Sequence, residues 1–297
     1  MRYTEEQLNS WTRPASKTEE SKMQNAEHMV REAIRSDEKL EGKSIDIFGQ
    51  GSYANNTNVR QNSDIDINVC LKDVFYFELP QGLSEEDAGI NHLSKSIYSY
   101  PDFKNDVEVA LVNKFGRNDI IRKNKCITIK GNSYRNETDV VPTCDYRRYK
   151  GYNNYVSGIK FLSDQGDWIV NFPKQHIKNG IIKNDETSRR FKRLTRLLRK
   201  IRYLMIEEGI DVSDNITSFL LECLLWNVPN EIINHFDTWQ DRLIYSIAYI
   251  YKHTKSHLEC ENWMEISELL YLFKGRRKWS FNDVNNYMSS LLRYLDV

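Results

Sequence analysis

Two acidic residues, Asp64 and Asp66, lie on a short segment in which polar and apolar residues alternate. The alternation runs from Asp64 to Leu71 and predicts a β-strand, because successive side chains of a strand point to opposite faces. Both carboxylates then share one face, with their Cα atoms about 6.6–7 Å apart. Carboxylates at this spacing can converge on two Mg²⁺ ions that lie about 3.5–4 Å apart. The pair predicts a two-metal centre, in which Mn²⁺ could substitute for Mg²⁺.

A flexible turn precedes this strand. Residues 44–48 are typical of a short strand, and Gln50, Gly51 and Ser52 follow it. Gly51 has no side chain, so its backbone can approach an anion closely, and Ser52 adds a hydroxyl donor. A Gly-Ser pair alone is usually only a turn, and an Asp-x-Asp alone is usually a solvated face. Together, at this spacing, they favour phosphate binding beside a metal centre, and therefore nucleotidyl transfer.

A third carboxylate is expected from a neighbouring strand, because two metal ions with octahedral oxygen shells need more ligands than two acids supply. Asp139 offers it, since it precedes Val140 and Val141 in a strand-like segment. We expect Pro142 to end that strand or to place it at a sheet edge, because proline cannot donate to the ladder. Asp64, Asp66 and Asp139 are the predicted catalytic and metal-binding residues.

These segments resemble one enzyme family. The residues that carry the likeness are Gln50-Gly51-Ser52-Tyr53-Ala54-Asn55-Asn56-Thr57, Ser63-Asp64-Ile65-Asp66-Ile67 and Asp139-Val140-Val141-Pro142. The chain is similar over nearly its whole length to the bacterial cGAS-like nucleotidyltransferases, the CD-NTases of CBASS anti-phage systems. The resemblance implies a polymerase-β-like fold and an enzyme that joins nucleoside triphosphates into a cyclic di- or trinucleotide and releases pyrophosphate. It also implies a CBASS-encoded regulatory partner.

The resemblance extends to the C-terminal half. Arg199 stands where the family commonly has a lysine that contacts the donor phosphates, and Lys200 could serve instead. Ser218 matches a phosphate-contacting serine, and Phe219 matches an aromatic residue that stacks on a base, although an aromatic in an apolar helical run is usually a core residue. Asn179, in a polar segment with His176, Lys183 and Asn184, is a candidate for nucleobase choice; a loop with its hydrogen bonds satisfied is the alternative.

The pattern of apolar residues predicts an α+β, bilobal protein. Ser16 and Glu19 form a capping box for a helix whose apolar residues recur up to Ile34, and we expect this helix to span both lobes. Residues 1–150 are the predicted catalytic lobe, with a further helix at Val107–Phe115. Residues 151–297 are the predicted, mainly helical lobe that closes the nucleotide cleft, with helices from about Glu186 and at Ile216–Leu225, Leu243–Tyr251, Met264–Phe273 and Val284–Leu295.

The composition excludes several classes of function. The 42 basic and 42 acidic residues balance, so no overall field favours a long nucleic acid. Five cysteines without metal-ligand spacing favour a reduced compartment and leave no counterpart to the zinc-bearing insertion of the animal DNA sensor. No apolar run approaches the roughly 20 residues of a membrane helix. We expect a cytoplasmic monomer that acts on nucleoside triphosphates.

Two alternatives remain open from the sequence. One is another polymerase-β-like enzyme, an adenylyltransferase that acts on a protein, an RNA end or a small molecule such as an antibiotic. The other is a non-enzymatic nucleotide-binding regulatory module with a degenerate site. The three acidic residues argue against the second, because a degenerate member is expected to lose one of them.

Overall fold

The computed structural model describes residues 1–14, 16–59 and 64–297. Ser63 of the Ser63–Ile67 segment lies outside the described residues. The chain forms two compact units, each assembled from separate stretches of sequence. The sheet unit comprises Ser16–Tyr53 and Ser63–Pro173, and the helical unit comprises Met1–Ala15, Ala54–Asn62 and Lys174–Val297.

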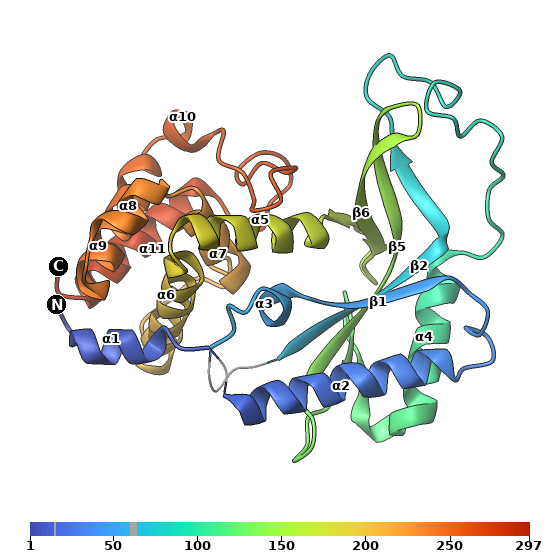
Figure 1. The fold of residues 1–297 in the computed structure, drawn as a ribbon, viewed down its shortest axis with the longest axis horizontal. Coiled ribbons are helices and arrows are strands. Elements are labelled where there is room, and N and C mark those ends of the chain that lie inside the picture. Colours follow the sequence, from blue (N-terminus) through green and yellow to red (C-terminus); the bar gives the residue numbers. More distant parts are fainter. Residues whose placement is uncertain (15, 60–63) are drawn as a thin grey trace. The chain divides into compact units, whose positions relative to one another are not determined.

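Among the residues that the structure describes, the sheet unit is built on a mixed, seven-stranded sheet (Figure 1). Its main strands follow the order β1-β2-β5-β4-β3, while β6 pairs with β5 and β7 pairs with β6. The β2–β5 pair is parallel and the other pairs are antiparallel. The strands are β1 (Ile45–Gln50), β2 (Ile65–Glu78), β3 (Ile120–Arg122), β4 (Ile127–Ile129), β5 (Thr138–Gly151), β6 (Asn154–Leu162) and β7 (Trp168–Asn171). This confirms the predicted α+β class with a mixed sheet.

Helices pack against this sheet. They are α2 (Lys17–Arg35) and α4 (Tyr100–Phe115), with a short α3 (Gly51–Ala54) and a 3₁₀ turn, η1 (Arg117–Asp119). The predicted capping box is present, because Ser16 accepts from the Glu19 amide while the Glu19 carboxylate accepts from the Ser16 amide. The buried α2 residues, from Met23 to Ile34, join the core of the sheet unit. The helix expected to span both lobes therefore belongs to the sheet unit.

The prediction for Pro142 was wrong. Pro142 lies inside β5, opposite Val69 of β2, and the strand continues to Gly151. Pairing of β5 with β4 ends at Val140, and pairing with β6 starts at Cys144. Pro142 therefore occupies the gap where β5 changes partner, and there a missing N–H costs no hydrogen bond to either neighbour.

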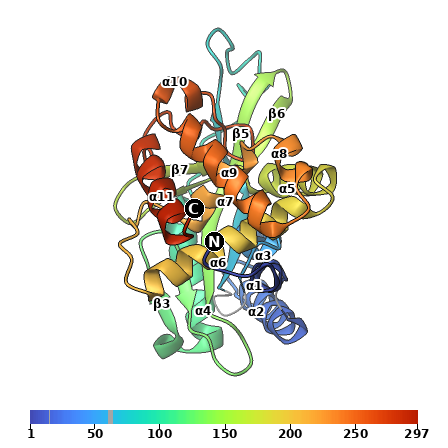
Figure 2. The same cartoon turned by 90° about the vertical axis from the view of Figure 1, so that its left-hand side faces the viewer.

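The helical unit gathers its helices around an apolar core, and Figure 2 shows these helices as ribbons. Leu8 of the N-terminal helix is fully buried in this core, and the Met1 amino group donates to the Asp296 carbonyl at 3.3 Å. The two chain ends are therefore neighbours within one unit. Its helices are α1 (Glu5–Trp11), α5 (Pro173–Glu186), α6 (Arg190–Glu207), α7 (Ser218–Trp226), α8 (Asn230–His235), α9 (Trp239–His253), α10 (His257–Cys260) and α11 (Phe281–Tyr294).

Three sequence expectations differ from this architecture. The boundary expected at residue 150 falls inside β5, and the sheet unit continues through β6 and β7 to Pro173. Residues 264–273 form no helix; Met264 and Tyr271 form an isolated antiparallel bridge instead. The segment around Asn179, expected as a polar loop, is helix α5. Its buried residues His176, Gly180 and Lys183 follow helical spacing, and Pro173 suits a first turn.

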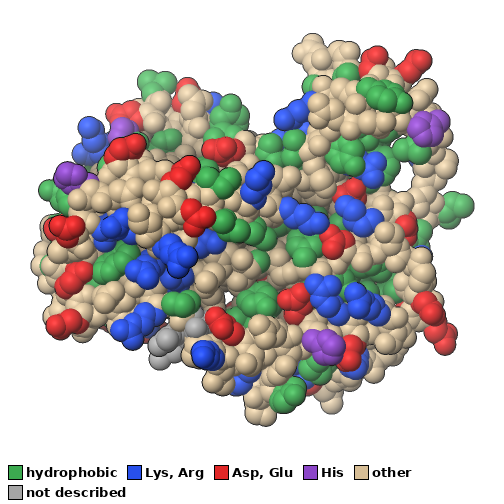
Figure 3. Space-filling view, viewed as in Figure 1, with side chains coloured by type: hydrophobic (Ala, Val, Ile, Leu, Met, Phe, Trp, Pro, Cys, Tyr) green, Lys and Arg blue, Asp and Glu red, His purple; other side chains and the backbone are tan. Residues whose placement is uncertain are grey.

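Charged side chains of both signs are interspersed over the face shown in Figure 3, in keeping with the balanced composition. Among the described helices, none has the length and apolar character needed to cross a membrane.

Candidate active site

One row of polar side chains crosses four adjacent strands of the sheet. Gln50 of β1 pairs with Asp66 of β2, Asp66 pairs with Asp139 of β5, and Asp139 pairs with Thr128 of β4. Residues that are paired across neighbouring strands project to the same face, with Cβ atoms about 4.5–5.5 Å apart in the antiparallel case. The strand register therefore brings together the acids that the sequence predicted on separate strands.

The backbone of Gly51 lies directly against the Asp66 carboxylate. Gly51 has a φ of +62°, and a Cβ built on it would lie 2.2 Å from Asp66 Oδ2. Any other residue would both strain the backbone and displace the carboxylate. The turn that was predicted to bind phosphate thus adjoins the predicted metal ligand, and Ser52 follows at a half-buried position.

Asp64 lies immediately before β2 and is exposed. Partial burial of its carboxyl group, together with the negative charges of Glu137 and Asp139, raises the pKa of Asp64. A bound cation would relieve the part of this shift that comes from the neighbouring negative charges.

Asp139 has its own set of partners. Thr128 Oγ1 donates a short hydrogen bond to Asp139 Oδ1. Lys123 Nζ lies 3.6 Å from the same oxygen and 3.6 Å from Glu137 Oε1. Although burial opposes it, the charge of Asp139 raises the pKa of Lys123. Within the described ranges, no three His, Cys, Asp or Glu side chains are gathered so that they could hold a metal ion. The three-acid metal site therefore stays a prediction.

Sequence reasoning missed Thr128, Lys123 and a buried polar group beside the row. Asn68 is fully buried; it donates to Gln50 Oε1 at 3.3 Å and accepts from Thr143 Oγ1 at 2.9 Å. Thr128 stands between Ile127 and Ile129, so its strand alternation was visible in the sequence. The pairing of Thr128 with Asp139 was not visible there, because strand pairing between distant segments is set by tertiary structure.

In the helical unit, Arg199 has a structural partner. Its side chain is 5 % exposed, and Nη1 donates to the Thr57 carbonyl at 2.9 Å and to Thr57 Oγ1 at 3.3 Å. Arg196 is also buried and binds the carbonyls of Thr12 and Asn56. The sequence has eight basic residues between positions 189 and 202, a pattern that predicts a mostly solvated helix face, and that prediction was wrong for these two arginines. Lys200, the alternative phosphate ligand, is half-buried.

Phe219 is an exposed aromatic residue. Its side chain is 38 % exposed and lies between His176 and Trp279, with ring centroids 5.7 and 6.1 Å away. The alternative that Phe219 is a core residue is therefore not what the structure shows. Ser218 precedes it at the start of α7, and its hydroxyl lies 3.5 Å from Tyr203 Oη. Both residues remain predicted nucleotide contacts.

Asn179 uses its amide within the protein. Nδ2 donates to the Ile266 carbonyl at 2.7 Å, which fastens the irregular 264–273 segment to α5. Nearby, His176 is 8 % exposed and its Nε2 lies 3.4 Å from Glu222 Oε1, while Thr57 Oγ1 donates to Glu222 Oε2 at 3.3 Å. Asn179 and His176 therefore contact groups of the protein itself, and base reading by Asn179 stays a prediction.

Comparison with known proteins decides the family. Residues 178–296 match the family described as the cGAS/DncV-like nucleotidyltransferase C-terminal helical domain. A cyclic dipyrimidine nucleotide synthase, CdnE, from Cecembia lonarensis is 63 % identical over 99 % of this chain and 99 % of its own. The chain belongs to the cGAS/DncV-like nucleotidyltransferases.

Solved structures support the same assignment. The CdnE cyclic dinucleotide synthase of Elizabethkingia meningoseptica, solved with GTP and Apcpp, superposes with a TM-score of 0.83 at 35 % identity, covering 99 % of this chain and 100 % of that chain. The CdnE c-UMP-AMP synthase of Rhodothermus marinus, solved with Apcpp and Upnpp, gives 0.83 at 28 % identity, covering 98 % and 97 %. This cGAS/DncV-like nucleotidyltransferase is therefore an enzyme of nucleotidyl transfer, and the interpretation as a non-enzymatic module is set aside.

Proposed function

We propose that the protein joins two nucleoside triphosphates, with a preference for pyrimidines, into a cyclic dinucleotide and releases pyrophosphate. The observation that carries this proposal is the row in which Asp66 lies between Gln50 and Asp139, with the Gly51 backbone against its carboxylate. A phosphate bound at Gly51 would lie beside two carboxylates, as transfer of a nucleotidyl group requires.

The carboxylates of this row have the oxygen-ligand chemistry that a divalent metal takes. A phosphate on the Gly51 and Ser52 amides would lie beside the like charge of Asp66, and partial burial together with the neighbouring acids raises the pKa of Asp64. Carboxylate oxygens are the ligands that Mg²⁺ prefers. We assign Asp64, Asp66 and Asp139 to two Mg²⁺ ions, for which Mn²⁺ would substitute. When bound, the ions would activate the attacking ribose hydroxyl and neutralise the triphosphate.

Other residues of the protein would bind and orient the nucleotides. Gly51 and Ser52 hold the β- and γ-phosphates so that the reacting phosphorus faces the attacking hydroxyl in line. Gln50 borders this position through its pairing with Asp66. In the helical unit, we assign Lys200 and Ser218 to the phosphates and Phe219 to base stacking, which is worth about 1–3 kcal/mol per base.

The preference for pyrimidines rests on similarity. The relative that is 63 % identical over nearly the full length is named a cyclic dipyrimidine nucleotide synthase. The Rhodothermus marinus structure contains a uridine as well as an adenosine nucleotide analogue. We extend the pyrimidine preference to this chain. The same proposal includes an anti-phage role within CBASS, a regulatory partner, a cytoplasmic location and a monomeric state. The five free, buried cysteines suit a reducing compartment.

The test is to incubate the purified protein with Mg²⁺ and each labelled triphosphate, singly and in pairs, and to separate the products before and after phosphatase and nuclease digestion. We expect a phosphatase-resistant product from UTP or CTP, and little product from ATP and GTP alone. Products that contain only purines would contradict the base preference. Label transfer only after an RNA, a protein or a small-molecule acceptor is added would replace the proposal with an adenylyltransferase-type function.

A further inference from the structure

Thr128 is the buried neighbour of the predicted metal ligand Asp139. Its side chain is 1 % exposed on the short strand β4, directly opposite Asp139 in the register. The Thr128 hydroxyl bonds Asp139 Oδ1, while the Asp139 side chain is 29 % exposed. The contact therefore ties a partly exposed carboxylate to a hydroxyl in the interior of the sheet.

The direction of this hydrogen bond follows from the chemistry of the two groups. An ionised carboxylate can only accept, so the Thr128 hydroxyl must donate to Asp139. Its oxygen can then accept from Cys126, whose Sγ lies 4.0 Å away. The hydroxyl proton of Thr128 is thereby directed toward Asp139.

Lys123 also approaches Asp139 but cannot orient it as well. Its ammonium group lies 3.6 Å from Oδ1, and its side chain is 45 % exposed. An exposed ion pair of this kind contributes little to stability and fixes no geometry. A hydrogen bond from a buried hydroxyl to a carboxylate is stronger and directional. Of the two neighbours, Thr128 is the one that can set the carboxylate rotamer.

We propose that Thr128 is a positioning residue that fixes the Asp139 carboxylate through Oδ1 and presents Oδ2 to the catalytic metal. The contacts from Thr128 and from Lys123 fall on Oδ1, which is why Oδ2 is assigned to the metal. The inference rests on the proposed metal-dependent function. Partners that orient a ligating carboxylate typically change metal affinity by about 10–100-fold when they are removed.

The experiment measures Mn²⁺ binding in the presence of a non-hydrolysable UTP analogue, by the electron paramagnetic resonance signal of free Mn²⁺. We expect Thr128→Val to weaken Mn²⁺ binding about 10–100-fold and to raise the Mg²⁺ concentration for half-maximal turnover similarly. Thr128→Ser, which keeps the hydroxyl, should restore both. Thr254→Val is the matched control, because Thr254 is also fully buried and its hydroxyl donates to the Ile250 carbonyl at 2.8 Å in the helical unit.

The outcomes separate this inference from the proposed function. If Thr128→Val binds Mn²⁺ as tightly as the wild type while Asp66→Asn loses binding, the positioning role alone is overturned. Equal binding by wild type and Asp66→Asn would overturn both. In an Asp139→Asn background, Thr128→Val should cause no further loss, and an additive loss would contradict the inference. If circular dichroism shows that Thr128→Val does not fold, Mn²⁺ binding by Thr128→Ala is compared with that by Thr128→Ser instead.

Discussion

Gly51 lies so close to the Asp66 carboxylate that no side chain fits at this position. The sequence predicted that its backbone would approach an anion, and the structure adds that the same backbone lies against Asp66. Asp64 and Asp66 were recognisable because alternation fixes which strand residues share a face. Thr128, which pairs with Asp139, could not be assigned from sequence, because β4–β5 register depends on contacts between distant segments.

We predict that Gly51→Ala lowers the catalytic rate about 100-fold, because a displaced Asp66 carboxylate or turn misplaces the reacting groups. The control is Gly42→Ala. Gly42 also has a positive φ, +77°, but a Cβ there would meet nothing within 4 Å. Both variants should lose about 1–2 kcal/mol of stability from the backbone strain. Steady-state rates and thermal unfolding distinguish the two effects, and equal activity of the two variants would refute the close approach.

Arg199 and Lys200 are neighbours for which we predict opposite phenotypes. Arg199→Met should lower the free energy of unfolding by about 2–3 kcal/mol, because it leaves the Thr57 carbonyl without its buried donor. Lys200→Met should leave stability unchanged and raise KM for the triphosphate about tenfold, the equivalent of one charged hydrogen bond. Chemical denaturation and initial rates test the pair. If Arg199→Met keeps the stability of the wild type and raises KM for the triphosphate, the phosphate contact belongs to Arg199 instead.

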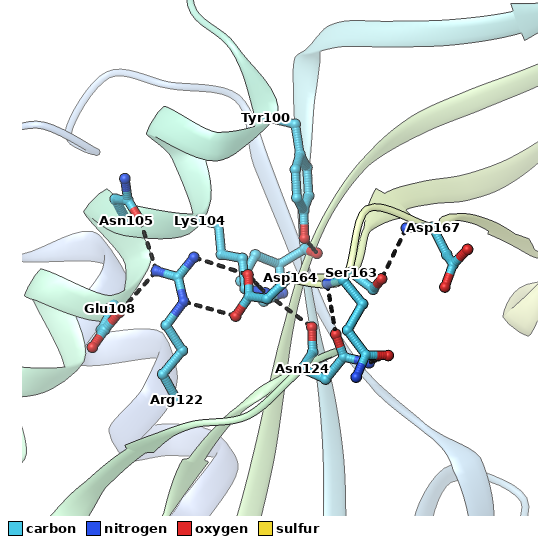
Figure 4. Close-up of polar contacts among 11 residues, drawn as sticks. Tyr100, Lys104, Asn105, Glu108, Arg122, Asn124, Ser163, Asp164 and Asp167 are labelled. Atoms are coloured by element: carbon cyan, nitrogen blue, oxygen red, sulfur yellow. Dashed lines mark hydrogen bonds and ion pairs between the residues drawn. The ribbon is translucent and has the colours of Figure 1, made fainter.

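At the scale of elements, one ion-pair network holds α4, β3 and the β6–β7 turn together (Figure 4). The Lys104 side chain is 1 % exposed, and its Nζ lies 2.8 Å from Asp164 Oδ1. Arg122 donates to both oxygens of Asp164 at 3.0 Å. The hydrogen bond from Arg122, with that from Lys104, lowers the pKa of Asp164 to about 2. The buried lysine therefore depends on the carboxylate for its counter-charge.

We predict that Asp164→Asn lowers the free energy of unfolding at pH 7 by about 3 kcal/mol, because it leaves a buried ammonium group unpaired. The folded-state pKa lies below the ordinary value of about 4, so the stabilisation is present above pH 4 and is lost as pH falls toward 2. The difference between variant and wild type should therefore shrink across that range in denaturation experiments. Asp167→Asn is the control, because Asp167 is exposed in the same turn and its carboxylate points away from the network in Figure 4.

Elements with strong apolar periodicity were predictable, and elements set by tertiary contacts were not. The helices that include Leu243–Tyr251 and Val284–Leu295 were expected from their periodicity, and α9 and α11 are there. The 264–273 segment has apolar residues at similar intervals, yet it forms a bridge that Asn179 and Asn227 fasten. Pro142 was misread because its effect depends on where β5 changes its pairing partner, which no local pattern reveals.

At the scale of the whole molecule, each unit is assembled from stretches that are distant in sequence. Leu8 and Met23 are close in the chain, but Leu8 is buried in the core of the helical unit and Met23 in the core of the sheet unit. The sequence could predict neither assignment, because both helices are amphipathic and either core could accept them.

We predict that Leu8→Ala and Met23→Ala each cost about 2–5 kcal/mol, the usual range for a cavity in a packed core. Hydrogen exchange should locate the effects in different units: α6 and α9 for Leu8→Ala, and β2 and α4 for Met23→Ala. If either variant exposed both sets of amides equally, the two cores would not be independent.

The most direct test of the account is a single-turnover measurement of pyrophosphate release from UTP and CTP with Mg²⁺ by wild type, Asp66→Asn and Asp46→Asn. Asp46 lies on β1 opposite Cys70, four residues along the strand from Gln50, which pairs with Asp66. Asp46→Asn is therefore the control for loss of a carboxylate elsewhere in the same sheet. We predict release by wild type and Asp46→Asn, and none by a folded Asp66→Asn. Undiminished release by Asp66→Asn would contradict the assignment of the catalytic centre to this row of the sheet.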